Sequence, residues 1–273
     1  MLFSIIIIIA SFIIAATFNG AGIDAVFGIR LIVTHPGRFH ADETAGVGMI
    51  KFFSPFVKVV RRVPTKADLA DPTVLVLDIG KDENYELNNM DHHQGLLNPA
   101  ACVMVLSILP LTDLEKWTIY FLIYNPISMS DIGITKSSSN DYNGVIRAFN
   151  TLNGGFDKAV ELGTMAFEGY LNTARSIIKT KDVWQSGEII FTNGVAIYEG
   201  DVFLQSWELF AEMDGIKFLV KKAGVRNPGE WQVLSRDSKQ FPIGKAEGQT
   251  FLHKNAFIAT YKTKEAAIAH MLG

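Results

Sequence analysis

The stretch Thr34-His35-Pro36-Gly37-Arg38-Phe39-His40-Ala41-Asp42-Glu43 decides how this chain is interpreted. It follows a β-rich run at residues 29–34 and leads into a helical pattern at 42–53, which ends before Pro55. Pro36 and Gly37 permit a sharp turn that would point His35 and His40 the same way. Imidazole and carboxylate groups gathered on such a loop are candidate metal ligands.

Two further β-rich runs follow at residues 57–63 and 73–78, with a short helical stretch at 66–70 between them. This alternation predicts βαβ units and a parallel sheet whose strands are buried. In open sheets of this kind ligands bind beyond the carboxyl ends of the strands. Asp78 closes the third strand, and the following loop carries Asp91-His92-His93-Gln94. We therefore expect both groups to join the first loop at one sheet edge.

The rest of the chain changes from helical to mixed patterns. Helical patterns cover residues 100–109, 114–124, 144–152 and 156–179. Beyond about residue 184, short β-rich runs at 188–191, 194–198, 216–220, 231–234 and 256–260 are joined by helical patterns at 203–213 and 263–271. The fold class is therefore α/β: a parallel sheet with flanking helices over residues 29–183, followed by a smaller α+β domain over 184–273.

Residues 1–28 form a hydrophobic segment with no charge before Asp24. Its apolar part is at the lower limit for a membrane span, and it has no basic region typical of a secretory signal. An uncleaved anchor, an atypical signal and a misplaced start codon remain open, so we set the segment aside. We expect a cytoplasmic protein, or a membrane-anchored one if this segment is genuine.

Composition limits the chemistry. The chain has 273 residues, 48% of them hydrophobic and 19% charged, with a formal charge of −3. A nucleic acid would therefore have to be held by a local groove or by metal ions rather than by overall charge. Cys102 is the single cysteine of the chain, which excludes an intrachain disulfide and a cysteine-based zinc cluster. It lies in an apolar run.

The His and Asp groups after the predicted strands together predict a metal site. Without thiolate ligands they suit Mn²⁺, Mg²⁺, Fe²⁺ or Zn²⁺. They offer more ligands than one tetrahedral ion needs, which favours a pair of ions. Two ions about 3.5–4 Å apart can activate a water and stabilise an in-line phosphoryl displacement.

The order of these motifs resembles the DHH phosphoesterase superfamily, and more closely the MYG exonuclease family. That family has a Thr-His-x-Gly-x-Phe-His-x-Asp-Glu pattern, matched by residues 34–43, an Asp-x-Gly matched by 78–80, and Asp-His-His-Gln matched by 91–94. Trp231-Gln232-Val233 and the segment 251–258 resemble its C-terminal motifs. The likeness extends over residues 29–273, and it implies a DHH-type first domain with the active site in a cleft between the two domains.

The resemblance also implies roles for individual residues. His35, His40 and Asp78 would hold one ion, while Asp42, the bridging Asp78, His92 and a later aspartate would hold the other. Asp131, in Asp131-Ile132-Gly133, best matches the family's Asp-Asn-Gly, with Asp113 and Asp141 as competitors. Among the catalytic residues, His93 would face the substrate phosphate, Asp91 would orient a histidine, and His253 would approach from the second domain, supported by Lys254 or Arg226.

The function implied is a metal-dependent phosphoesterase. The resemblance points to a 3′–5′ exonuclease acting on RNA or short oligonucleotides through a water activated by two Mn²⁺, with Mg²⁺ as the alternative. The alternatives are a pyrophosphatase-like hydrolase of a small phosphoanhydride or nucleotide, and a catalytically inactive binding protein.

Glu43 is either a general base or a helix-start carboxylate, and Arg61 and Arg62 are expected at the surface. Metal identity, RNA against DNA, cleavage polarity and oligomeric state are left open.

Overall fold

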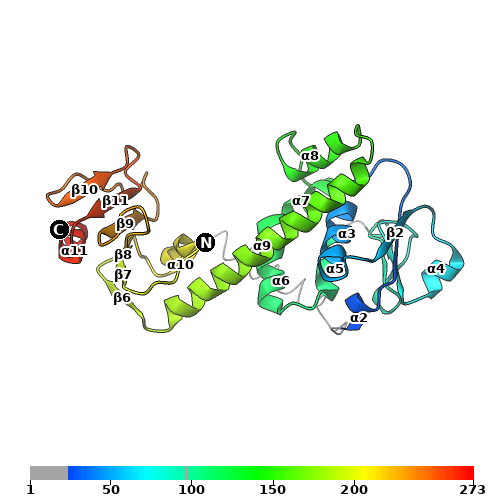
Figure 1. Cartoon of the computed structure of the whole chain (residues 1–273), viewed down its shortest axis with the longest axis horizontal. Coiled ribbons are helices and arrows are strands. Elements are labelled where there is room, and N and C mark those ends of the chain that lie inside the picture. The colour runs from blue at the N-terminus through cyan, green and yellow to red at the C-terminus, as the bar shows by residue number, and fades with distance from the viewer. Residues whose placement is uncertain (1–23, 96–97) are drawn as a thin grey trace. The chain divides into compact units, whose positions relative to one another are not determined.

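The computed structural model describes residues 24–95 and 98–273 and divides into two compact units, Met1–Ala174 and Arg175–Gly273 (Figure 1). The predicted hydrophobic segment lies mostly outside the described residues. Its last residues do not: α2 (Asp24–Phe27) places Val26 in the core of unit 1, fully buried. The fold therefore begins before the segment that we set aside has ended. None of the described helices is long and apolar enough to cross a membrane.

Unit 1 is built around a five-stranded sheet in the order β2-β1-β3-β5-β4. Its strands are β1 (Leu31–Thr34), β2 (Lys58–Arg61), β3 (Val74–Leu77), β4 (Glu83–Asn84) and β5 (Asn89–Met90). All pairs are parallel except that of β4 with β5. The predicted α/β class with a parallel sheet is confirmed. The two-residue strands β4 and β5 and the 3₁₀ turn η1 (Tyr85–Leu87) were not predicted.

The two faces of this sheet bury different clusters. Ile32, Leu75 and Leu77 join the main core with α3 (Ala41–Phe53) and α5 (Ala101–Ile108), and Cys102 is fully buried there as expected. The alternate residues of β1 and β3 form a smaller cluster with Leu69 of α4 (Lys66–Ala70) on the opposite face. Because successive side chains of a strand point to opposite faces, both faces of the strands are apolar.

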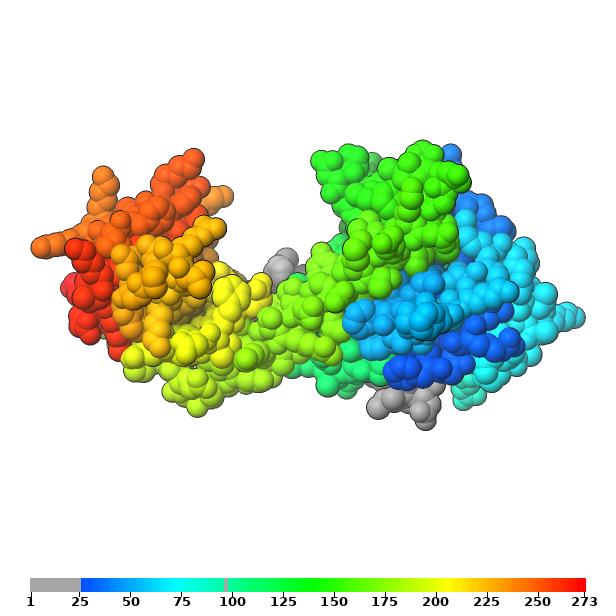
Figure 2. All heavy atoms as spheres, viewed as in Figure 1, coloured from blue at the N-terminus to red at the C-terminus, as the bar shows by residue number. Residues whose placement is uncertain are grey.

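The remaining helices of unit 1 cover the main core. They are α6 (Asp113–Ile119), the π-helical segment η2 (Tyr120–Tyr124), α7 (Asn125–Asp131), α8 (Tyr142–Phe149) and α9 (Gly155–Gln185). The first part of α9 crosses α3, where the Thr164 hydroxyl donates to the Gly48 carbonyl over 3.2 Å (Figure 1). The green residues of α9 adjoin blue residues of this unit in the space-filling view (Figure 2). The sequence predicted α9 and α8 but not α7.

Unit 2 contains a six-stranded sheet in the order β10-β11-β9-β8-β7-β6. Its elements are β6 (Ile189–Thr192), β7 (Val195–Tyr198), α10 (Trp207–Met213), β8 (Phe218–Lys222), β9 (Trp231–Ser235), β10 (Gln249–Leu252), β11 (Ile258–Tyr261) and α11 (Lys264–Leu272). Only β7 and β8 pair in parallel. The division between the units falls inside α9, whereas the sequence placed the change near the end of that helix.

Candidate metal centre

The loop between β1 and α3 carries His35 at one end and His40 at the other. The side chain of Asn150 binds its middle: it accepts from the Phe39 N–H (3.0 Å) and donates to the Phe39 carbonyl (2.9 Å). Arg61 donates to the Gly37 carbonyl over 2.9 Å. These contacts from distant parts of unit 1 hold the loop in one conformation.

Arg61 is not the surface residue that we predicted. Its side chain is 24% exposed, and its guanidinium lies 4.6 Å from the ring centroid of Phe156 and 5.5 Å from that of Phe39. Arginine stacks on aromatic faces in this way when it is partly desolvated. Since Arg61 also binds the Gly37 carbonyl, it positions the loop that carries both histidines.

Glu43 lies below the same loop with its side chain fully buried. It accepts hydrogen bonds from the Thr34 hydroxyl and from the His40 N–H, and lies 3.3 Å from Nε2 of His35. Burial raises the pKa of Glu43 to about 7, while the neighbouring His35 acts in the opposite direction. These contacts extend well beyond a helix-start role and make Glu43 a positioning residue for His35 and His40.

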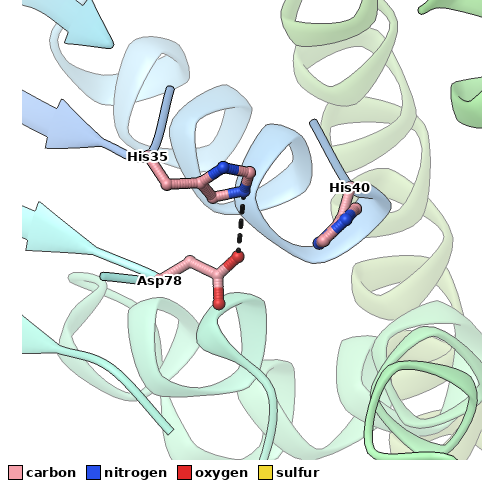
Figure 3. A group of neighbouring side chains, drawn as sticks. All are labelled: His35, His40 and Asp78. Atoms are coloured by element: carbon pink, nitrogen blue, oxygen red, sulfur yellow. Dashed lines mark ion pairs between the residues drawn. The ribbon is translucent and has the colours of Figure 1, made fainter. Parts of the chain in front are cut away.

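Asp78 follows β3 directly and faces this loop. Its Oδ2 lies 3.6 Å from Nε2 of His35, and its Oδ1 lies 3.2 Å from Nε2 of His92. Figure 3 shows Asp78 with His35 and His40, which come from the end of β1 and the start of α3. One ligand atom from each of the three lies within 4.8 Å of the others. Asp78 therefore stands between two groups of potential ligands.

The second group gathers around His92. Nε2 of His92 lies 3.1 Å from Oδ2 of Asp131 and 3.9 Å from Oδ2 of Asp42, in addition to its approach to Asp78. Asp131 is the last residue of α7, which places it at the cluster. Its competitors have other positions: Asp113 is exposed in the first turn of α6, and Asp141 caps α8 by accepting from the Gly144 N–H.

Two observations fit this cluster to metal ions. Ligands about 2.1 Å from one ion lie about 3.0–3.4 Å apart at octahedral or tetrahedral angles, which is close to the His92 contacts with Asp78 and Asp131. Buried polar atoms also lack hydrogen-bond partners among the described residues: Nε2 of His35 and His92, both carboxylate oxygens of Asp42, and Oδ1 of Asp78. Because unpaired buried polar groups are costly, their convergence here indicates a cation site.

The electrostatics of the cluster agree with this interpretation. Burial, and then the charges of Asp78 and Asp131, raise the pKa of Asp42 well above its usual value. Burial favours neutral His92, but the nearby carboxylates of Asp131 and Asp78 outweigh it and raise the pKa of His92 to about 10. Both shifts favour the protonated forms of these groups, and divalent ions would displace such protons on binding.

Asp91 connects two loops beside the cluster. Its Oδ1 lies 2.5 Å from Nδ1 of His93, and its Oδ2 accepts from the Lys81 N–H over 2.7 Å. Burial disfavours the carboxylate, but hydrogen bonds from His93 and Lys81 outweigh it and lower the pKa of Asp91. The histidine that Asp91 orients is therefore His93, whose side chain is 56% exposed.

His253 lies in unit 2, between β10 and β11. Its Nδ1 accepts from the Asn255 N–H over 3.1 Å, and its ring lies 4.3 Å from that of Phe257. Its predicted approach to the substrate stays a prediction, as does that of Lys254 or Arg226.

The fold and the cluster define a class: an α/β protein with a parallel sheet, whose strand ends carry a His/Asp cluster that could bind metal. Residues 31–101 match the family model MYG1_exonuc, described as an uncharacterised protein family (UPF0160). The resemblance to the MYG exonuclease family is thus confirmed, and the matched range contains His35, His40, Asp42, Asp78, Asp91, His92 and His93.

No curated protein matches the chain. A solved structure described as a pGpG-specific phosphodiesterase, PggH, from Vibrio cholerae is 9% identical, and the match covers 89% of this chain and 96% of that one. Its TM-score is 0.32.

Proposed function

We propose that this protein is a metal-dependent phosphoesterase, an exonuclease that shortens RNA or short oligonucleotides. The observation that carries the proposal is the convergence of unpartnered buried atoms from His35, Asp42, Asp78 and His92. The family resemblance, which includes the Asp-His-His motif, supports the same reaction class. The proposed ligands are His35, His40 and Asp78 for one ion, and Asp42, Asp78, His92 and Asp131 for the other.

The proposed ions are two Mn²⁺, or Mg²⁺ in their place. Such a pair would lower the pKa of an attacking water and neutralise the charge of the phosphate. Charge supplied locally in this way explains how a chain of net charge −3 can act on a polyanion.

His93 is the proposed contact with the substrate phosphate. Because its Nδ1 lies against Asp91, its Nε2 is the nitrogen left for a ligand. Its exposure distinguishes it from His92, which is buried among carboxylates. Asp91 is therefore a positioning residue in this proposal: its carboxylate accepts from Nδ1–H of His93, and Nε2–H of the imidazolium would donate to a phosphate oxygen.

The test uses the full chain with Mn²⁺, Mg²⁺ or EDTA, and labelled RNA, single-stranded DNA, a dinucleotide and pyrophosphate as substrates. We expect metal-dependent shortening of RNA or the dinucleotide, abolished in His92→Ala and in Asp78→Ala. The matched control is His270→Ala. His270 binds the Tyr261 hydroxyl through Nδ1 (2.6 Å) in unit 2, so its loss should leave the activity intact.

Each alternative has its own outcome. Hydrolysis of pyrophosphate alone would replace the exonuclease with a small-substrate hydrolase on the same residues. No turnover of any substrate, together with no bound metal by elemental analysis, would contradict the enzyme proposal and leave a binding protein. If His92→Ala and His270→Ala lose equal amounts of activity, the loss is not specific to the cluster, and the cluster has no part in the reaction.

A further inference from the structure

A hollow of about 480 Å³ lies beside the cluster, at the carboxyl end of β3. Val63, Pro64, Leu69 and Ile79 form its apolar walls, and Asp78 and His93 line it as well. The last two belong to the candidate metal centre, so the hollow is continuous with the position proposed for the phosphate. Its volume lies within the range of small-molecule sites.

The backbone that borders the hollow is held in an uncommon conformation. Asp78 and Lys81 have φ of 56° and 54°, and Gly80 between them has φ of 110°. Non-glycine residues with positive φ persist where the surroundings hold them. Here Asp91 does so, since its Oδ2 accepts from the Lys81 N–H. The carboxylate that orients His93 thus also holds the edge of the hollow.

Gly80 keeps this edge close to the apolar wall. A Cβ added there would lie 3.2 Å from Cδ2 of Leu69 and 3.6 Å from Cγ of Pro64. A larger side chain at this position would extend into the space between the loop and the wall. The loop therefore approaches the wall closely without filling the hollow.

The walls favour a largely apolar group. Val63 is 68% exposed, which leaves an apolar surface open to a ligand beside the polar cluster. A nucleotide has this polarity: an anionic phosphate at one end and a flat base, with an apolar face, at the other. A base that packs against such a wall buries apolar surface, whichever base it is.

We propose that this hollow binds the nucleobase of the nucleotide whose phosphate lies at the metal cluster. The inference rests on the proposed function and adds to it the place where the base of the substrate binds. Val63 and Leu69 supply the apolar contact, and His93 lies between base and cluster. The site therefore selects for a base next to the scissile phosphate, without reading its identity.

The test compares two probes that differ only in the base, adenosine 5′-monophosphate and ribose 5-phosphate. Calorimetric titration of the full chain with Mg²⁺ should give an affinity about ten- to a hundredfold higher for the nucleotide, as burial of roughly 60–100 Å² of apolar surface predicts. Val63→Asn, which has an amide in place of an exposed apolar side chain, should reduce that ratio several-fold. Val225→Asn, at a 98% exposed position in unit 2, is the matched control.

A second measurement does not depend on the variants. Methyl groups of Val63 and Leu69 should show intermolecular nuclear Overhauser effects to adenine protons in the Mg²⁺-loaded chain. Equal affinity for both probes, or no such effects at saturation, would overturn the inference. Shortening of RNA by the same preparation would then show that the proposed function stands without it. Binding of neither probe together with no hydrolysis would overturn both.

Discussion

Nε2 of His92 lies 3.1 Å from Oδ2 of Asp131, although the helices from α5 to α7 separate the two residues in the chain. The contact joins the Asp-His-His loop of the sheet to the end of a helix that the sequence did not predict. It also explains why Asp131, and neither Asp113 nor Asp141, joins the cluster.

Asp131→Asn tests whether this contact belongs to a metal site. The amide removes one charge from a group that includes Asp42 and Asp78, so we expect Mn²⁺ affinity to fall by about ten- to a hundredfold. Calorimetric titration with Mn²⁺ measures the change. Asp113→Asn, which removes the same charge from an exposed position on α6, should bind Mn²⁺ as the parent does. Similar affinity in both variants would exclude Asp131 as a ligand.

Asn150→Ala tests the anchoring of the loop between His35 and His40. The change leaves the N–H and the carbonyl of Phe39 without their partner, and Phe39 is 5% exposed. Loss of these bonds should lower the free energy of unfolding by about 1–3 kcal/mol and weaken Mn²⁺ binding as well. Thermal unfolding and titration measure the two effects. Asn140→Ala is the control, because that side chain is exposed. An unchanged melting temperature would show that the loop does not depend on Asn150.

The central elements of unit 1 could be predicted because they have strong local patterns. The apolar runs that became β1 and β3 are buried on both faces, and α3 begins within one residue of its predicted start. His35 follows β1 and Asp78 follows β3, and the two lie 3.6 Å apart at the carboxyl edge of the sheet, whereas His92, 3.2 Å from Asp78, follows β5, which was not predicted.

Other parts lacked such a pattern. Two-residue strands such as β4 and β5 are too short for any periodicity. α7 was missed because Asn125-Pro126 resembles a break, whereas the helical run continues from α6 through the π-helical η2 into α7. The roles of Arg61 and Glu43 depend on which groups the fold brings into contact with them, and neither spacing nor residue type contains that information.

Asp68→Asn tests a structural ion pair below the sheet edge. Asp68 accepts from the guanidinium of Arg62 at 2.7 and 2.9 Å and from Thr65 at the start of α4. The hydrogen bonds from Arg62 and then Thr65 hold the pKa of Asp68 well below its usual value. Since Arg62 is 41% exposed and the pair is screened by solvent, we expect a loss of only about 1 kcal/mol near neutral pH.

The pH dependence of that loss has a definite sign. A carboxylate whose pKa is lowered on folding stabilises the native state above its unfolded pKa of about 3.9, and the contribution is lost as pH falls toward the folded pKa. The difference between parent and Asp68→Asn should therefore be constant from about pH 5 to 8 and shrink below about pH 4. Urea unfolding across this range measures it. A difference that grows on acidification would contradict the assignment.

Gly48→Ala tests the crossing of α3 and α9, on which the main core of unit 1 depends. An added Cβ at Gly48 would lie 2.7 Å from the backbone carbon of Gly163 and 2.7 Å from the amide nitrogen of Thr164. Backbone atoms cannot move aside as a flexible side chain can, so the helices must separate, at a cost of about 1–3 kcal/mol. Gly169→Ala is the matched control on α9, because a Cβ there meets nothing within 4 Å. It should stabilise the protein by about 0.5–1 kcal/mol, since alanine favours the helix over glycine. Chemical unfolding of both variants separates the two effects, and a Gly48→Ala protein as stable as the parent would show that the helices do not approach this closely.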